Sequence, residues 1–244
     1  MTYAWILDKG EFVPLHQLEL SPDDRAWAYG DGVFSTLKVE QQTPLFLEEH
    51  LERLQSHAAS LGIAFPKILP AQIVTCVPPG DWKMKIILTG GSNTALGLPP
   101  KRAGDFVLVF SNLPPNPKSW KVCRYPHVIE SPLARIKSLA YLERSMVTQY
   151  ALDQGCDEAL VCNSQGFLLE GGRSNFFWTL DHDFFTPNPD LPLLFGLTLK
   201  HEMERHRSQG FKIHYVQLTP EEIPQQAKLF AANSLIGSVR CLLK

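Results

Sequence analysis

Three prolines within four residues are the sequence feature that most constrains the fold of this chain. They lie in the segment 113–119. Because proline has no amide N–H and a fixed φ, this segment cannot lie in a helix or in a central strand. We therefore predict that residues 113–119 link two domains, residues 1–112 and residues 120–244. A chain of 244 residues is long enough for each part to bury a core of its own.

The N-terminal domain combines strand-like and helix-like segments. Short apolar runs predict strands at residues 4–7, 33–39, 84–89 and 106–111. Apolar residues then recur at helical spacing from Leu47 to Leu61, and Gly62 is a typical helix stop. This mixture favours an α/β sandwich-like domain, in which helices cover a sheet.

The C-terminal domain shows a similar mixture with shorter segments. One helix is predicted with Leu139, Leu142, Met146 and Tyr150 along its apolar face, ending near Gly155. A second helix is predicted from about residue 196 to residue 208. Strands are predicted at residues 158–162, 174–179, 184–186, 212–216 and 228–232. We expect an α+β protein whose C-terminal domain is a barrel-like, strongly curved sheet with helices outside it.

Composition and charge exclude several functional classes. The formal net charge is −2 and no basic face is evident, which argues against nucleic acid and anionic membranes as partners. No apolar run approaches the ~20 residues that span a bilayer, and the first residues do not resemble a signal peptide. The five cysteines show no close pairing and suit reduced thiols. His201 and His206 are one residue too far apart for a zinc-binding helix, so no metal is predicted. We expect a cytoplasmic protein that acts on a small molecule.

Lys137 and Glu170 are the two residues that point to a specific chemistry. Lys137 precedes the predicted helix between the apolar residues Ile136 and Leu139, and Glu170 opens a predicted strand. A desolvated lysine can hold the aldehyde of pyridoxal 5'-phosphate as a Schiff base, and a carboxylate can keep the pyridine nitrogen protonated. Taken singly, each residue has an ordinary alternative, a solvated surface lysine and an exposed carboxylate at a strand end.

A cofactor phosphate would need fixed hydrogen-bond donors, and three places in the sequence could supply them. Residues 195–198 open a predicted helix, whose free N–H groups favour an anion, and Thr198 adds a hydroxyl. Residues 233–234 form a second small polar turn. Arg53 could form a fork to a phosphate, although a surface pair with Glu49 at the i,i+4 spacing is the ordinary alternative.

The order of these segments resembles the class IV aminotransferase family, the pyridoxal phosphate enzymes of fold type IV. That family includes branched-chain aminotransferases, D-amino acid aminotransferases and aminodeoxychorismate lyases. The resemblance covers nearly the whole chain and rests on residues 24–36, 50–54, 136–139, 170–177, 184–186 and 194–198. No single segment is specific, but their joint occurrence in this order is. The resemblance implies a homodimer with each active site near the subunit interface.

The resemblance also implies roles for individual residues. Lys137 would be the catalytic Schiff-base lysine, and Glu170 would pair with the pyridine nitrogen. Tyr141 lies about one residue from where some members place a tyrosine against the cofactor ring, and Thr36 would face the substrate. Residues 30–32 would frame a turn beside the site. The phosphate would be held by an arginine, two residues of a helix N-terminus and a serine, namely Arg53, Leu197, Thr198 and Ser234.

Within the family, the chain most resembles aminodeoxychorismate lyase in its length and in residues 29–36 and 157–161. That enzyme eliminates pyruvate from 4-amino-4-deoxychorismate to give 4-aminobenzoate for folate biosynthesis, and the freed lysine would act as general base and acid. A branched-chain or D-amino acid aminotransferase is the alternative. A cofactor-binding protein with little catalysis, or a divergent enzyme of another reaction type, is a third possibility.

One departure from the lyases concerns the substrate. Residues 90–98 form a glycine-rich loop where such lyases usually carry arginines for the substrate carboxylates, and here the loop has none. We expect that charge to come from Lys101, Arg102, Arg135 or Arg173. Arg135 and Arg173 flank the segments of Lys137 and Glu170, and two unpaired cations there would need an anion.

Overall fold

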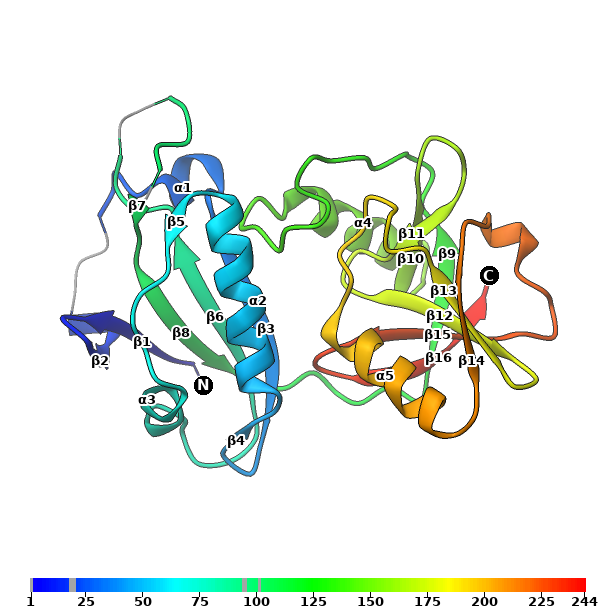
Figure 1. Cartoon of the computed structure of the whole chain (residues 1–244), viewed down its shortest axis with the longest axis horizontal. Coiled ribbons are helices and arrows are strands. Elements are labelled where there is room, and N and C mark those ends of the chain that lie inside the picture. The colour runs from blue at the N-terminus through cyan, green and yellow to red at the C-terminus, as the bar shows by residue number, and fades with distance from the viewer. Residues whose placement is uncertain (1, 18–20, 94–95, 101) are drawn as a thin grey trace. The chain divides into compact units, whose positions relative to one another are not determined.

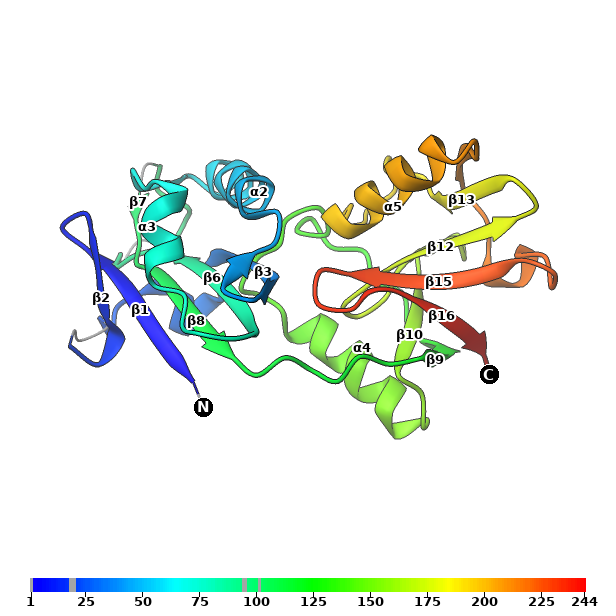
Figure 2. The same cartoon turned by 90° about the horizontal axis from the view of Figure 1, so that it is seen from below.

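The computed structural model describes residues 2–17, 21–93, 96–100 and 102–244. The chain divides into two compact units (Figures 1 and 2). Unit 1 contains Met1–Pro115 and Ile136–Tyr141, and unit 2 contains Asn116–Arg135 and Leu142–Lys244. The short segment Ile136–Tyr141, which carries Lys137, therefore packs with unit 1, whereas the sequence assigned it to the second domain.

Unit 1 is a six-stranded antiparallel sheet covered by helices. The strands follow the order β2-β1-β8-β6-β3-β4. Their bounds are β1 Tyr3–Asp8, β2 Glu11–Pro14, β3 Gly32–Glu40, β4 Thr43–Pro44, β6 Trp82–Thr89 and β8 Phe106–Ser111. The helices are α1 Arg25–Tyr29, α2 Leu47–Ser60 and α3 Pro70–Thr75, with a 3-10 turn at Leu15–Gln17 and a small pair of strands, β5 Ile63–Ala64 and β7 Arg102–Ala103.

The core of unit 1 follows from the two periodicities of its sequence. On β6, Met84, Ile86 and Leu88 alternate with more accessible residues and are fully buried. Leu51 and Leu54 lie on the buried stripe of α2, which packs on β3 (Figure 1). Alternation places one face of a strand toward the core, and helical spacing places one stripe toward it. The four strands and the helix that the sequence predicts in this part are confirmed.

Unit 2 is an eight-stranded mixed sheet with the order β11-β10-β9-β16-β15-β12-β13-β14. Its strands are β9 Ser119–Arg124, β10 Glu158–Cys162, β11 Leu168–Glu170, β12 Asn175–Leu180, β13 Asp183–Pro187, β14 Lys212–Val216, β15 Lys228–Asn233 and β16 Gly237–Leu243. The helices are α4 Leu142–Asp153 and α5 Leu197–Ser208, with a 3-10 turn at Pro220–Glu222. The Leu168 N–H donates to Leu218 O at 2.8 Å. Because Leu218 lies two residues beyond the end of β14, this bond joins the two edges of the sheet, and the predicted barrel-like shape is confirmed.

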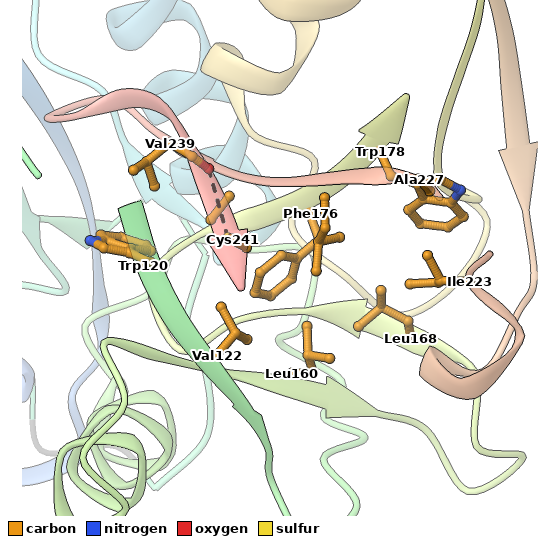
Figure 3. Close-up of a cluster of buried hydrophobic side chains, with 12 residues drawn as sticks. Trp120, Val122, Leu160, Leu168, Phe176, Trp178, Ile223, Ala227, Val239 and Cys241 are labelled. Carbon is orange, nitrogen blue, oxygen red and sulfur yellow. Dashed lines mark hydrogen bonds between the residues drawn. The ribbon is translucent and has the colours of Figure 1, made fainter. Parts of the chain in front are cut away.

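The interior of the curved sheet is filled by apolar side chains from nearly every strand (Figure 3). Phe176 and Trp178 of β12 are both fully buried and point inward, as expected for residues two apart on one strand. Trp120 and Val122 of β9 and Cys241 of β16 meet them from the neighbouring strands. The sheet therefore encloses a packed core, which fixes the strand ends and loops around it.

Several local predictions need correction. Helix α4 begins at Leu142, so Lys137 does not lie at its mouth. The apolar stripe expected on this helix is wrong, because Leu142 is 76% exposed and Met146 is 57% exposed, whereas Val147 is fully buried. Glu170 closes β11 and does not open a strand.

The predicted linker ends where strand β9 begins, at Ser119. Strands β9, β11 and β16 were not predicted. All five cysteines are free thiols. Among the described residues, no helix combines the length and the apolar character needed to cross a bilayer.

Candidate active site

Lys137 lies in a short non-helical segment that pairs with the edge of β3 through a bridge between Ser138 and Val33. The Phe34 N–H donates to Lys137 O at 2.9 Å, and the Leu139 N–H donates to Gly32 O at 2.9 Å. This approach depends on Gly32, since a Cβ there would lie 2.5 Å from Leu139 Cδ1 and 2.7 Å from Leu88 O. The expected structural role of residues 30–32 thus has a physical basis, because only glycine leaves room for the segment that carries the lysine.

The side chain of Lys137 lies among aromatic rings of the same unit. Its Nζ is 4.8 Å from the ring centroid of Phe34 and 5.5 Å from that of Tyr141. The two rings meet edge to face, with centroids 5.2 Å apart. Aromatic rings exclude water from one side of the amine while their faces still stabilise a cation. Tyr141 therefore lies beside Lys137, although its spacing in the sequence differs from the usual one.

Arg53 projects from α2 toward the α2-covered face of β3. Its Nη2 donates to Ser35 Oγ at 2.9 Å and lies 3.4 Å from His50 Nδ1, while Ser35 Oγ and His50 Nδ1 are 2.8 Å apart. Burial lowers the pKa of Arg53 to about 10. Within the part of the chain that the structure describes, Arg53 pairs with no carboxylate, so the surface pair with Glu49 does not form. A guanidinium withdrawn from water without a counter-ion favours an anionic ligand.

His57 lies one helical turn beyond Arg53 and was not predicted as part of the site. Its Nδ1 accepts the backbone N–H of Lys137 at 3.1 Å. Burial, with smaller contributions from the charges of Arg53 and Lys137, lowers the pKa of His57 to about 4. The imidazole is therefore neutral at neutral pH. The only sequence signal was the i,i+4 spacing from Arg53, which by itself distinguishes nothing.

The sheet face opposite to the one that α2 covers carries a second lysine near the Phe34 ring. Lys85 of β6 is the cross-strand partner of Thr36 on β3, so both side chains share the face of Phe34. The Lys85 Nζ lies 4.7 Å from the Phe34 centroid. Burial lowers the pKa of Lys85, with a smaller contribution from Lys83. Lys85 forms no ion pair with a carboxylate among the described residues. The alternation of side chains along β6 could have predicted the sheet face on which Lys85 lies, but not which residues surround it.

Glu170 in unit 2 is buried at the end of β11 and is held by a residue that the sequence did not predict. Arg144 of α4 donates through Nη2 to Glu170 Oε1 at 2.5 Å and through Nη1 to Gly171 O at 3.4 Å. The Leu194 N–H donates to the same Oε1 at 3.2 Å. Charge-assisted hydrogen bonds of this kind stabilise the ionised form of a carboxyl group. Glu170 is thus positioned as a buried negative charge.

The turn that follows Glu170 is fixed by a second carboxylate. Glu158 is fully buried, and its two oxygens accept hydrogen bonds from the Ser174 hydroxyl at 2.8 Å and the Gly172 N–H at 3.0 Å. The N–H groups of Ala159 and Arg173 donate to it as well. Burial raises the pKa of Glu158, and these donors oppose that shift. The carboxylate anchors the glycine-rich turn next to Glu170.

The N-terminus of α5 is the predicted anion site of unit 2. Gly196 is its N-cap residue, and the Gly196 N–H donates to Asn175 Oδ1 at 3.0 Å. Thr198 Oγ1 lies 3.4 Å from Ser234 Oγ, so two hydroxyls meet over the first turn of the helix. The first N–H groups of a helix have no partner within it and carry partial positive charge. The arrangement suits a phosphate, and the structure brings Thr198 and Ser234 together as expected.

The cations expected to bind substrate carboxylates are engaged elsewhere or fall outside the description. Arg102 is buried and pairs with Asp31, which also accepts from Arg25 Nε at 2.7 Å. Arg135 is exposed and donates to the main-chain oxygens of residues 190 and 191. Arg173 donates to a main-chain oxygen of residue 157 at 2.9 Å. Neither of the last two is the unpaired cation that the sequence argument assumed. Lys101 and residues 94–95 of the glycine-rich loop lie outside the described residues.

These donor sets fit pyridoxal phosphate. Unit 1 offers an amine against aromatic rings and a buried guanidinium that pairs with no carboxylate. Unit 2 offers a buried carboxylate held by an arginine, and a helix N-terminus with two hydroxyls. These are the groups that an aldehyde, a phosphate and a basic ring nitrogen require. In the described part of the chain, no group of three or more His, Cys, Asp or Glu side chains could hold a metal ion.

Comparison with known proteins agrees with the fold and with this chemistry. The family model of amino-transferase class IV matches residues 32–242. This chain belongs to the class IV aminotransferase family. The match spans β3 to β16 and includes every candidate residue named above from Phe34 to Ser234.

Individual relatives are similar over most of the chain. The protein of Methanocaldococcus jannaschii named "Putative branched-chain-amino-acid aminotransferase" is 26% identical over 240 residues, which cover 92% of this chain and 82% of that protein. The aminodeoxychorismate lyase of Vibrio harveyi is 25% identical over 235 residues, covering 91% and 86%. The solved branched-chain aminotransferase of Thermoproteus uzoniensis has a TM-score of 0.87 at 17% identity, covering 99% of this chain and 87% of that one, which shows a shared fold.

Proposed function

We propose that this protein is a pyridoxal-phosphate-dependent 4-amino-4-deoxychorismate lyase, which releases pyruvate and leaves 4-aminobenzoate. The observation that carries the proposal is the pair of lysines on the Phe34 ring. Lys137 would supply the reactive amine, and Lys85 places a second cation against the same ring, one that pairs with no carboxylate among the described residues. The substrate is a dianion with one carboxylate on its ring and one on its enolpyruvyl group. Lys85 would bind one of them and thereby replace the arginines missing from residues 90–98.

The cofactor, when bound, supplies an electron sink for negative charge that develops on the substrate. Lys137 would bind it covalently through its aldehyde, and Glu170 would pair with its ring nitrogen. Tyr141 would lie against the ring. Its phosphate would be held by a guanidinium, a helix N-terminus and a hydroxyl, namely Arg53, Leu197, Thr198 and Ser234. Arg144 supports the assignment of Glu170, because its guanidinium keeps that carboxylate ionised in a buried position.

Lys137 would also move the protons of the elimination. With the substrate in the site, the neutral amine of Lys137 would take the proton from the substrate ring carbon. The C–O bond to the enolpyruvyl group then breaks, the ring becomes aromatic, and a proton returns to the departing three-carbon fragment as pyruvate. Thr36 lies on the same sheet face as Phe34 and Lys85, where its hydroxyl would contact the substrate.

A class IV aminotransferase is the second candidate. It is supported by the similarity to the relative from Methanocaldococcus jannaschii, whose identity to this chain is as high as that of the lyase. A branched-chain amino acid has an apolar side chain, which would leave the Lys85 ammonium without an anion. That mismatch is the reason to favour the lyase.

The substrate assay tests the proposal directly. We expect the purified holoenzyme to form fluorescent 4-aminobenzoate and an equal amount of pyruvate from 4-amino-4-deoxychorismate, and Lys137→Ala to abolish this. Lys85→Met should raise KM more than it lowers kcat, and Lys85→Arg should restore most of the loss. Conversion of the bound cofactor to its amine form by L-leucine or D-alanine, with no 4-aminobenzoate produced, would instead establish the aminotransferase.

The cofactor assignment has its own test. Borohydride reduction of the holoenzyme followed by peptide mass mapping should find the pyridoxyl group on Lys137. An adduct on Lys85 would exchange the roles of the two lysines, and an adduct on a peptide without either would refute the site.

A further inference from the structure

His57 contacts the main chain of Lys137 and lies one helical turn beyond Arg53 on α2. One ring nitrogen, Nδ1, accepts the Lys137 N–H at 3.1 Å. Arg53 and His57 are four residues apart on α2, so their side chains lie side by side on one face of the helix. The Arg53 charge is also felt by the imidazole, where it opposes protonation.

We propose that His57 donates its Nε2–H to the phosphate of the cofactor while its Nδ1 holds the backbone of Lys137. This inference rests on the proposed function, since it assumes that pyridoxal phosphate binds with its phosphate at Arg53. It adds a phosphate ligand from unit 1, and it links occupancy of the phosphate site to the position of the lysine that binds the aldehyde.

The tautomer of the ring supports this role. A neutral imidazole has one N–H donor and one acceptor nitrogen. Because Nδ1 accepts from Lys137, the proton must reside on Nε2. The pKa of about 4 keeps the ring neutral at neutral pH, so it offers one donor without adding charge beside Arg53 and Lys137. No acceptor for Nε2 is found among the described residues.

The chemistry around the ring specifies an anion as the acceptor. Arg53 is largely withdrawn from water and pairs with no carboxylate in the described part of the chain. His57 is one of the residues one helical turn from Arg53, so an anion that accepts hydrogen bonds from the Arg53 guanidinium would also lie near the His57 ring. A phosphate has enough oxygens to accept from a guanidinium and an imidazole at the same time.

Two substitutions separate the donor from the acceptor. In His57→Asn, the amide oxygen replaces Nδ1 and can still accept the Lys137 N–H, but no atom replaces Nε2. In His57→Gln, the longer side chain places an amide N–H near the position of Nε2 and loses the acceptor near Nδ1. Arg53→Lys serves as the matched control, because it weakens an assigned phosphate ligand and leaves His57 intact.

The experiment compares the affinities of each apoenzyme for pyridoxal phosphate and for pyridoxal, which lacks the phosphate, by titrating the absorbance of the bound cofactor. We expect His57→Asn to weaken binding of pyridoxal phosphate about tenfold, the effect of losing one hydrogen bond to a charged group, and to change pyridoxal binding less than about twofold. His57→Gln should weaken both ligands and keep their affinity ratio near that of the wild type. Equal weakening of both ligands by His57→Asn would mean that the residue only supports the backbone, and would overturn the proposal.

A measurement on the unmodified protein gives an independent result. The imidazole of His57 in the wild-type apoenzyme can be followed by NMR while inorganic phosphate is added. We expect its pKa to rise as the anion binds, and an unchanged pKa at saturating phosphate would overturn the proposal. Wild-type protein that binds no pyridoxal phosphate at all would instead refute the proposed function, so the two failures are distinguishable.

Discussion

The ion pair between Arg144 and Glu170 allows a direct test of how unit 2 stabilises the buried carboxylate of Glu170. Arg144→Met keeps the length and the apolar stem of the side chain and removes the charge. The two side chains are 12% and 8% exposed, and their closest atoms are 2.5 Å apart. The substitution therefore leaves the Glu170 carboxylate in a largely buried place without its guanidinium. We expect the apoprotein to lose stability.

The size of the loss follows from the geometry. Two unit charges about 4 Å apart interact by about 4 kcal/mol at an effective dielectric constant of about 20. Removing one partner of a buried pair costs about 3–5 kcal/mol in measured cases. The pair here retains some solvent contact, and the Leu194 N–H still donates to Glu170 Oε1. We therefore expect Arg144→Met to lower the free energy of unfolding by about 2–4 kcal/mol.

Urea unfolding of the apoprotein measures this loss, and a double-mutant cycle isolates the pair. Glu170→Gln keeps the shape of the carboxylate and removes its charge, so Arg144→Met should cost much less in that background. We expect a coupling free energy above about 1.5 kcal/mol for this contact. If the two substitutions add to within about 0.5 kcal/mol, the pair does not stabilise Glu170 and the argument fails.

Three further predictions concern the same neighbourhoods. The pKa of His57 is lowered from 6.5 to about 4, so the unfolded chain binds the extra proton, and the free energy of unfolding should fall as the pH drops through this window. His57→Asn should flatten this pH profile in thermal unfolding. Glu158→Gln should lower the free energy of unfolding by about 2–3 kcal/mol, because the new N–H₂ group would face donors such as the Gly172 N–H or the Ser174 hydroxyl. An unchanged stability in urea would mean that the carboxyl group is protonated in the folded protein. Gly171→Ala should lower the free energy of unfolding by about 1–3 kcal/mol, since the new Cβ would lie 2.7 Å from Glu158 Cδ. A melting temperature equal to that of the wild type would contradict this steric argument.

Much of the secondary structure could be predicted from the sequence because it depends on local periodicity. The strands Phe106–Ser111, Glu158–Cys162 and Lys212–Val216 occur with the predicted bounds. The helix α2 was indicated by its apolar stripe, and α5 by its glycine N-cap. These features depend on the spacing of apolar residues and on the residues at turns and caps, and both are local properties of the sequence.

The prediction failed where pairing between distant segments decides the structure. The stripe of Leu142 and Met146 resembles a buried helix face, but α4 buries Val147 and Ala151 instead. Strand β9 begins at Ser119, the last residue of the predicted linker, because it pairs with β10 and β16. The local sequence does not determine which side of a helix packs on the core, or which strand a short strand pairs with.

The candidate residues divide in the same way. Residue type, order and resemblance alone indicate Lys137, Glu170, Arg53 and the hydroxyls of Thr198 and Ser234. The sequence therefore proposes the functional groups of the candidate site. Folding decided which groups surround each of them. His57 is 80 residues from Lys137 in sequence, and Arg144 is 26 residues from Glu170. Such contacts arise because a sheet edge or a helix face brings remote segments within hydrogen-bonding distance, and this proximity determines which charges are paired and which remain to bind a ligand.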